Sequence, residues 1–130
     1  MTNERGSAAI LLLAVAGLVV VLTIGVADVG AALAARLQAA AAADAAALGA
    51  APVTFRPFGA EGSPASEAGR LATANGATLV SCRCPIDRNW RSRVVEVTVE
   101  RRVSLLGLGS ITVRASSQAE FDPTKLLGNP

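Results

Sequence analysis

The 130-residue sequence contains no histidine and no tyrosine, and Lys125 is its only lysine. Histidine is the commonest general base and the commonest metal ligand, so the usual basis of a catalytic or metal site is missing. The only two cysteines, Cys82 and Cys84, form a Cys-x-Cys pair without the further ligands that structural zinc needs. No nucleophile–base pair, Gly-rich phosphate loop or metal-ligand set occurs. We therefore expect no enzymatic activity, no metal and no cofactor.

Charge and aromatic residues are also scarce. The formal net charge is +2 and aromatic residues make up 3% of the chain. A nucleic-acid-binding protein usually has a strongly basic net charge, and this chain does not, so we expect no nucleic acid partner. Apolar residues, in contrast, make up 52% of the chain and are concentrated in residues 1–51. That part of the chain does not follow the pattern of an ordinary soluble fold.

Residues 8–27 (AAILLLAVAGLVVVLTIGVA) carry no charge. A run of about 20 apolar residues is the length that crosses a hydrocarbon core, and in lipid it has to be helical. A cleaved signal peptide is the alternative, but its apolar core is shorter, about 7–15 residues. Arg5 precedes the run and Asp28 follows it. The sequence therefore predicts a single retained span in the cytoplasmic membrane, with residues 1–7 inside and the rest of the chain outside.

The helical pattern continues beyond the apolar run. Alanine, the best helix former, makes up about two thirds of residues 31–51, and the first proline after the run is Pro52. These features predict one helix over residues 7–50, half of it outside the membrane. Small residues at i, i+4 spacing form a ridge that allows close helix packing, although any Ala-rich segment shows such a ridge. Because alanine buries little area, this half needs a neighbour, either the head or other copies. The ridge consists of Ala31, Ala35, Ala39, Ala43 and Ala47.

The remaining chain predicts a small head. Residues 51–65 form a Pro- and Gly-rich linker, residues 66–120 the head, and residues 121–130 a flexible tail. Ser63 and Pro64 are a helix-start signal, and Asn75-Gly76 is an end signal.

Alternating valines mark residues 93–103 as a strand, with further strand signals at 78–82 and 111–115 and a Gly-containing connection between them at 104–110. The fold class is therefore α+β: a long N-terminal transmembrane helix that extends out of the membrane, then a short helix and a three-stranded antiparallel sheet. One face of the sheet needs a cover, which the short helix and the outer part of the long helix can supply.

Two features of the head have alternative interpretations. Cys82 and Cys84 form a strained local bridge, a bridge between chains, or two free thiols; an oxidising exterior favours a bonded pair. The turn Leu105, Leu106 and Leu108 is either core or a docking point for the membrane or a partner.

The segment 83–93 also has two readings. It either contacts anionic polymer, lipid head groups or DNA phosphates, or it is a solvated loop whose aromatic residue folds back on the sheet. Its candidate contact residues are Arg83, Arg88, Trp90, Arg91 and Arg93.

An ordered set of short segments runs along nearly the whole chain: RGSAA at 5–9, DVG at 28–30, RLQ at 36–38, ADAAAL at 43–48, ATANGATLVSCRC at 72–84 and LLGLGSITVRASS at 105–117. In this order they resemble the TadE/TadG-like proteins of Tad (Flp) pilus assembly, and within them the actinobacterial TadE-like subgroup. The resemblance implies a pilin-like fold and a minor, pseudopilin-like structural subunit of a pilus or secretion apparatus.

The resemblance also implies partners and a processing site. The partners are other TadE/TadG-like or pilin subunits, the Tad assembly platform and further copies of the chain, at the cell surface or in a pilus. Pilin-type precursors are cut after a glycine, with a glutamate five residues on. Gly6-Ser7 fits the cleavage position, but Leu11 stands where the glutamate would be. The alternative function is a membrane-anchored binding module for envelope polymer or a membrane partner.

Overall fold

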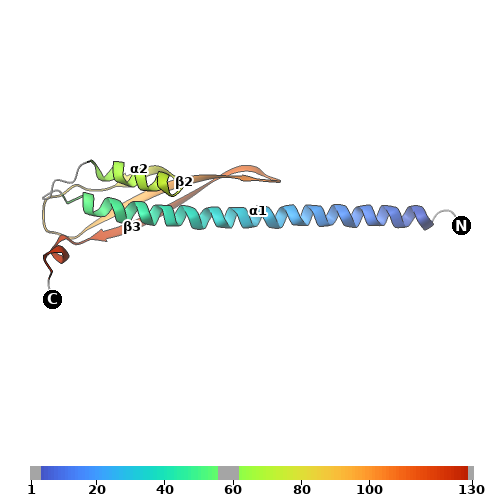
Figure 1. Ribbon diagram of the computed structural model, residues 1–130, viewed down its shortest axis with the longest axis horizontal. Coiled ribbons are helices and arrows are strands. Elements are labelled where there is room, and N and C mark those ends of the chain that lie inside the picture. Colours follow the sequence, from blue (N-terminus) through green and yellow to red (C-terminus); the bar gives the residue numbers. More distant parts are fainter. Residues whose placement is uncertain (1–3, 56–61, 129–130) are drawn as a thin grey trace.

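The computed structural model describes residues 4–55 and 62–128, which form one long helix and a small α/β head (Figure 1). The predicted α+β class is confirmed: the three strands form one antiparallel sheet in the order β1-β2-β3. In chain order the elements are α1 (Glu4–Val53), α2 (Pro64–Ala74), β1 (Thr78–Arg83), β2 (Arg93–Leu105), β3 (Gly109–Phe121) and the 3-10 helix η1 (Pro123–Leu127).

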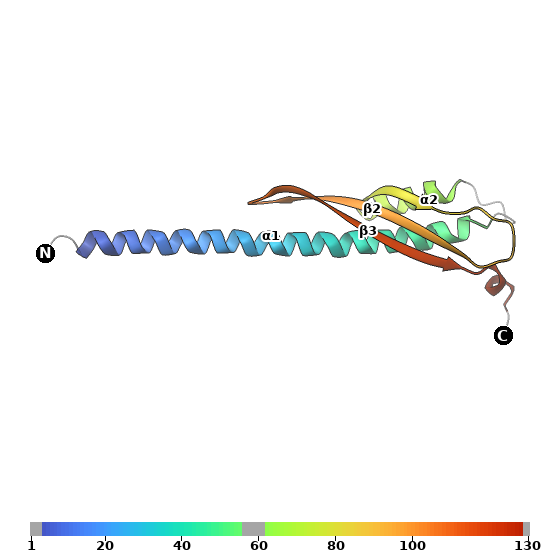
Figure 2. The same ribbon diagram turned by 180° about the vertical axis from the view of Figure 1, so that it is seen from behind.

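Helix α1 is 50 residues long, and only its C-terminal half lies against the head (Figures 1 and 2). It continues to Val53 rather than ending at residue 50, so the expected stop at Pro52 was wrong. In the last helical turn a proline removes only one hydrogen bond, which the helix end tolerates. The Thr54 N–H then donates to the Ala51 carbonyl at 3.2 Å and closes the helix.

Strands β2 and β3 form a long hairpin of two 13-residue strands. Their register runs from Arg93 opposite Phe121 to Leu105 opposite Gly109. Most of the expected 104–110 connection is therefore strand, and the turn itself is only residues 106–108. Strand β3 is longer than the predicted 111–115 because β2 offers an unbroken row of backbone partners to its polar C-terminal part.

The core lies between α1 and the sheet, with α2 packed on α1 and β1. Alanines from the two helices meet valines from one face of β2, and this pairing brings the helix backbone close to the sheet. Gly49 in α1 leaves room for the Leu71 side chain of α2. The core includes Ala42, Ala43, Ala46, Ala47, Ala50, Ala68, Ala72, Val95, Val97 and Val99.

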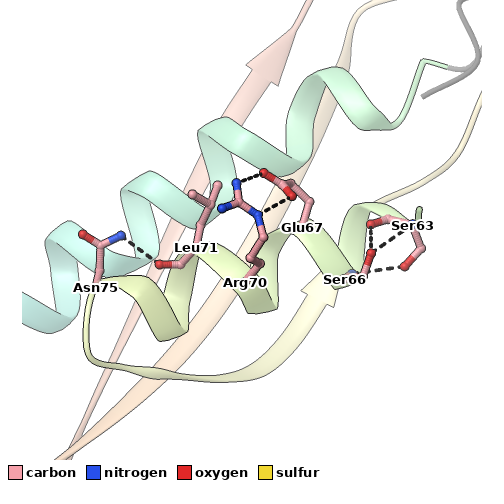
Figure 3. A network of polar contacts seen from close by, with 6 residues as sticks. All are labelled: Ser63, Ser66, Glu67, Arg70, Leu71 and Asn75. Carbon is pink, nitrogen blue, oxygen red and sulfur yellow. Dashed lines mark hydrogen bonds and ion pairs between the residues drawn. The ribbon is translucent and has the colours of Figure 1, made fainter. Parts of the chain in front are cut away.

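Both ends of α2 are capped as the sequence predicts (Figure 3). The Ser63 hydroxyl accepts from the Ser66 N–H at 3.1 Å, and the Ser66 hydroxyl accepts from the Ser63 N–H at 3.0 Å. Pro64 is the first helical residue, and the Asn75 side chain donates to the Leu71 carbonyl at 2.8 Å. The head therefore begins at Pro64, two residues before the predicted boundary at 66.

The segment 121–128 carries regular structure, whereas the sequence predicted a flexible tail over 121–130; the mobility of this segment stays a prediction. Phe121 closes β3, and the buried Pro123 begins η1. The Asp122 carboxylate caps η1 by accepting from the Thr124 N–H at 3.0 Å and its hydroxyl at 2.6 Å. Of the predicted linker 51–65, the part at 56–61 lies outside the described residues, as do 129–130 of the tail.

Candidate functional site

The N-terminal half of α1 has no cover. Every residue from 6 to 27 is exposed, including Ile10 at 70%, Leu13 at 73% and Val21 at 66%. At 1.5 Å per residue these residues span about 33 Å, close to the thickness of a hydrocarbon core. Helix α1 is therefore long and apolar enough to span a membrane. A bare apolar surface of this size requires lipid or other protein around it.

The alanine ridge faces the head of its own chain. Ala35, Ala39, Ala43 and Ala47 are at most 2% exposed, and Ala31 is half-buried. Of the two neighbours that the Ala-rich half could have, the head is the one that covers this ridge. The ridge is therefore not available to a second copy while the head stays in place.

The opposite face of the outer half of α1 carries three exposed leucines. Leu33, Leu37 and Leu48 are 58%, 66% and 67% exposed. At 100° per residue the three leucines fall within about 60° of one another, on the side opposite Ala35, Ala39 and Ala46, and Val26 continues this line into the bare half. Leu33 lies at the edge of this face, beside Ile111 and Val113 of β3. Asp44 lies within the same face and is also exposed. This leucine face is the apolar surface of the outer helix that remains open to a partner.

Asp28 joins α1 to the turn of the β2–β3 hairpin. Its side chain is 6% exposed, and its Oδ1 and Oδ2 accept the N–H groups of Leu106 at 2.6 Å and Gly107 at 2.8 Å. A Cβ at position 107 would lie 3.1 Å from Asp28 Oδ2 and 3.2 Å from Ile24 Cγ2, so glycine allows this close approach. Sequence reasoning treated Asp28 only as the charge that ends the apolar run. No local pattern links it to a turn 78 residues later.

The leucines of this turn divide between the two interpretations. Leu105 is 8% exposed and belongs to the core, whereas Leu106 and Leu108 are 80% and 77% exposed. The turn therefore presents two large apolar side chains outward while its backbone is held by Asp28.

Arg93 closes the other end of the head and is not a surface residue, which corrects its place among the contact candidates. It is 8% exposed. Its guanidinium donates to the carbonyl oxygens of Thr54 at 3.2 Å and Arg91 at 3.2 Å, and to those of Asp87 and Asn89. It thereby ties the end of α1 to the loop before β2.

Trp90 folds back on Phe55, just after the end of α1, whereas the second interpretation of the segment placed it on the sheet. Its ring meets Phe55 edge-on with centroids 4.9 Å apart, and the Arg93 guanidinium lies 5.5 Å from the same Phe55 ring. Asp87 also organises the loop. Its pKa is lowered because the Asn89 N–H donates to its carboxylate, with a smaller contribution from the Arg93 charge.

Three arginines of the segment, Arg83, Arg88 and Arg91, are exposed near the C-terminal end of α1. Arg83 lies 3.7 Å from Glu96, a long surface ion pair that adds little stability. These three side chains stay accessible, as does Trp90 at 43% exposure, so Arg93 is the one member of the predicted contact set that is buried.

Cys82 and Cys84 form a disulfide with a Cα–Cα distance of 5.4 Å. Both residues are half-buried and pack against the core, so the local bridge is the alternative that the structure adopts. The candidate processing site, Gly6-Ser7, lies in the first turns of α1, and cleavage there stays a prediction.

Within residues 4–55 and 62–128, no three His, Cys, Asp or Glu side chains come together as a metal site would require. Glu96 and Glu100 lie on the outer face of β2, paired with Arg83 and Arg114. The absence of enzymatic activity remains a prediction. Searches of protein-family models, of curated proteins and of solved structures found no match to this chain.

Proposed function

We propose that this protein is a pilin-like, minor structural subunit of a Tad (Flp)-type pilus or secretion apparatus, which acts in assembly or priming through helix packing. The observation that carries the proposal is the division of α1. One continuous helix has a bare apolar half of membrane length and a second half fixed to a small head. The TadE/TadG-like order of segments along the chain adds to this observation.

The chain is anchored in the cytoplasmic membrane by residues 8–27, with its N-terminus inside and its head outside. Arg5 on one side of the span and Asp28 on the other agree with the positive-inside rule. The Cys82–Cys84 disulfide supports the same orientation, because disulfides persist in oxidising compartments outside the cytoplasm.

Subunit contacts use the leucine face rather than the alanine ridge. The head already covers the ridge, whereas Leu37 and Leu48 remain exposed on the opposite side and Leu33 is exposed at the edge of that face, beside β3. This face is continuous with the bare half, so a neighbouring helix can follow α1 from the membrane outward. The partners are other TadE/TadG-like or pilin subunits, the Tad assembly platform, or a second copy of this chain.

The test is crosslinking in native membranes at one position on this face. Leu37→Cys is compared with Gln38→Cys, which is also exposed but lies about 100° round the helix. A bismaleimide reacts with the added thiol and leaves the Cys82–Cys84 disulfide intact. We expect Leu37→Cys to crosslink to itself or to a pilin-like partner and Gln38→Cys to crosslink much less. An anchored protein that crosslinks at neither position would contradict the assembly function.

A membrane-anchored binding module is the second candidate, and the exposed arginines favour it. Arg83, Arg88 and Arg91 lie at the end of the head opposite the hairpin turn, where they would face anionic envelope polymer. Replacing all three with glutamine separates the two functions. Loss of polymer binding with unchanged crosslinking at position 37 would assign binding to this loop and assembly to the helix.

A further inference from the structure

The turn of the β2–β3 hairpin lies beside the outer end of the bare apolar helix (Figure 2). Asp28, the first charged residue after the run, accepts the N–H groups of Leu106 and Gly107. The turn also extends past Asp28 toward the N-terminus, since a Cβ on Gly107 would lie 3.2 Å from Ile24 Cγ2. Ile24 is one helical turn inside the uncharged run. Any bilayer that covers the whole run therefore also reaches the turn.

The hairpin end has the composition of a membrane-contacting loop. Residues 103–113 (VSLLGLGSITV) contain no charged side chain. Leu106 and Leu108 point outward at 80% and 77% exposure, while Asp28 satisfies two of the turn's backbone donors. Unpaired backbone N–H groups are costly at the boundary of the hydrocarbon region. A loop whose N–H groups are hydrogen-bonded and whose leucines point outward can therefore enter that boundary.

An apolar groove separates the hairpin end from α1. Its lining includes Val21, Ile24 and Val29 of the helix, and Leu105, Leu108 and Ile111 of the hairpin. Val21 lies seven positions before Asp28, which is about 10 Å along the helix axis. The groove thus runs from the head into the depth range of the acyl chains, and nothing in the described residues fills it.

A band of arginines marks the upper limit of this uncharged region. Arg101 and Arg102 on β2 lie opposite Val113 and Thr112, and Arg114 follows on β3. Arg101 donates to the Gly76 carbonyl at 2.8 Å and Arg114 lies 3.3 Å from Glu100, whereas Arg102 is exposed. Arginine stems can lie along apolar surface while the charged group reaches lipid phosphates. From its tip, the hairpin therefore presents first apolar side chains, then uncharged strand ends, and then cations. This sequence matches the order of acyl chains, interface and head groups in a bilayer leaflet.

We propose that the hairpin end is a second membrane contact of this protein. Leu106 and Leu108 enter the outer leaflet beside α1, lipid acyl chains occupy the groove, and the exposed Arg102 meets the phosphates. With α1 and the hairpin both inserted, the head has one fixed orientation on the membrane. The inference rests on α1 spanning the bilayer and does not depend on a role in pilus assembly.

The experiment places an environment-sensitive fluorophore on the full-length chain in vesicles of phosphatidylcholine and phosphatidylglycerol at a high lipid-to-protein ratio. Leu108→Cys carries the probe at the tip. Gln118→Cys is the control, because it is exposed on β3, the strand that follows the turn, and lies far from the turn. Leu18→Cys reports insertion of α1 itself. We expect brominated lipid to quench position 18 strongly and position 108 by roughly half, as for side chains 5–10 Å into the interface. Position 118 should instead be quenched by aqueous iodide.

Two results would overturn the proposal while leaving the membrane anchor intact. In the first, position 18 is quenched by brominated lipid but position 108 is as open to iodide as position 118. In the second, position 108 is protected from iodide without bromolipid quenching, and the protection disappears on further dilution with lipid. That outcome would show that a second copy, not lipid, covers the tip. Because crosslinking at position 37 is measured separately, failure of either proposal is recognised independently.

Discussion

The two halves of α1 differ in the size of their side chains as well as in charge. The membrane half is built of Leu, Val and Ile and stays bare, with Leu12 68% exposed. The outer half is built largely of alanine and is covered by the head, with Ala46 at 0%. Small side chains let a sheet approach the helix backbone, whereas large ones offer apolar area to lipid. Size, rather than hydrophobicity alone, thus decides which half packs inside the protein.

The largest effect is expected from charging the bare half. Val15→Arg combined with Val19→Arg places two cations near the middle of the run, at a cost of about 2.5–3.5 kcal/mol each. Leu33→Arg combined with Leu37→Arg has the same spacing on exposed positions of the outer half. Membrane fractionation should show the first variant lost from the membrane and the second retained. If both variants were retained in the membrane fraction, or both were lost from it, the two halves of α1 would not lie in different environments.

The second effect is expected from enlarging a covered alanine. Ala46→Leu inserts three carbon atoms between α1 and the sheet and should lower the free energy of unfolding by about 3 kcal/mol. Ala40→Leu adds the same atoms on the exposed side and should change it by less than about 0.5 kcal/mol. Thermal unfolding of the full chain in detergent, followed by circular dichroism, gives both values. A tolerated Ala46→Leu would contradict close packing of the ridge.

A smaller effect is expected at the end of the outer half, where Arg93 holds the loop to α1. Arg93→Met keeps much of the side-chain volume but removes the hydrogen bonds to the loop and Thr54 carbonyls, which should cost about 2 kcal/mol. Arg91→Met removes an exposed arginine of the same loop and serves as control. Urea unfolding should separate the two variants. Similar midpoints would show that Arg93 contributes no more than a surface charge.

The smallest effect concerns the exposed surface of the head. Glu67 and Arg70 form an ion pair of 2.6 Å, and the hydrogen bond from Arg70 lowers the pKa of Glu67 below its ordinary value of 4.5 (Figure 3). Because the folded pKa is the lower one, the pair stabilises the head above the unfolded pKa and loses this contribution as pH falls through the folded pKa. A carboxyl NMR titration should show the depressed pKa, and Arg70→Gln should return it toward 4.5. An unchanged pKa in that variant would exclude Arg70 as the cause.

Much of the fold follows from local signals. The uncharged run, the Ser63-Pro64 start of α2 and the alternating valines of β2 each act within a few residues, and the structure confirms them. The ends of elements were harder to predict. Residues 116–118 of β3 (Ser-Ser-Gln) have little strand preference of their own and are held by pairing with β2. Likewise, η1 depends on Asp122 acting as its cap.

The candidate site was only partly predictable. The Arg-rich segment and the leucine turn were recognised, but the sequence could not separate their buried members from their exposed ones. Arg93 and Leu105 became structural, while Arg88 and Leu106 remained at the surface. This division depends on which backbone groups and apolar surfaces lie opposite each side chain, and those neighbours come from distant parts of the chain.

The sequence by itself determined that a long apolar helix precedes a small α/β head, because length, charge and periodicity are local properties. Tertiary structure alone decided which alanines are covered, which leucines stay open, and that Asp28 and Arg93 fasten the two ends of the head. The Arg93–Thr54 contact spans 39 residues and the Asp28–Gly107 contact spans 79. Such contacts exist only once the sheet lies along the helix, so no local pattern of residues encodes them.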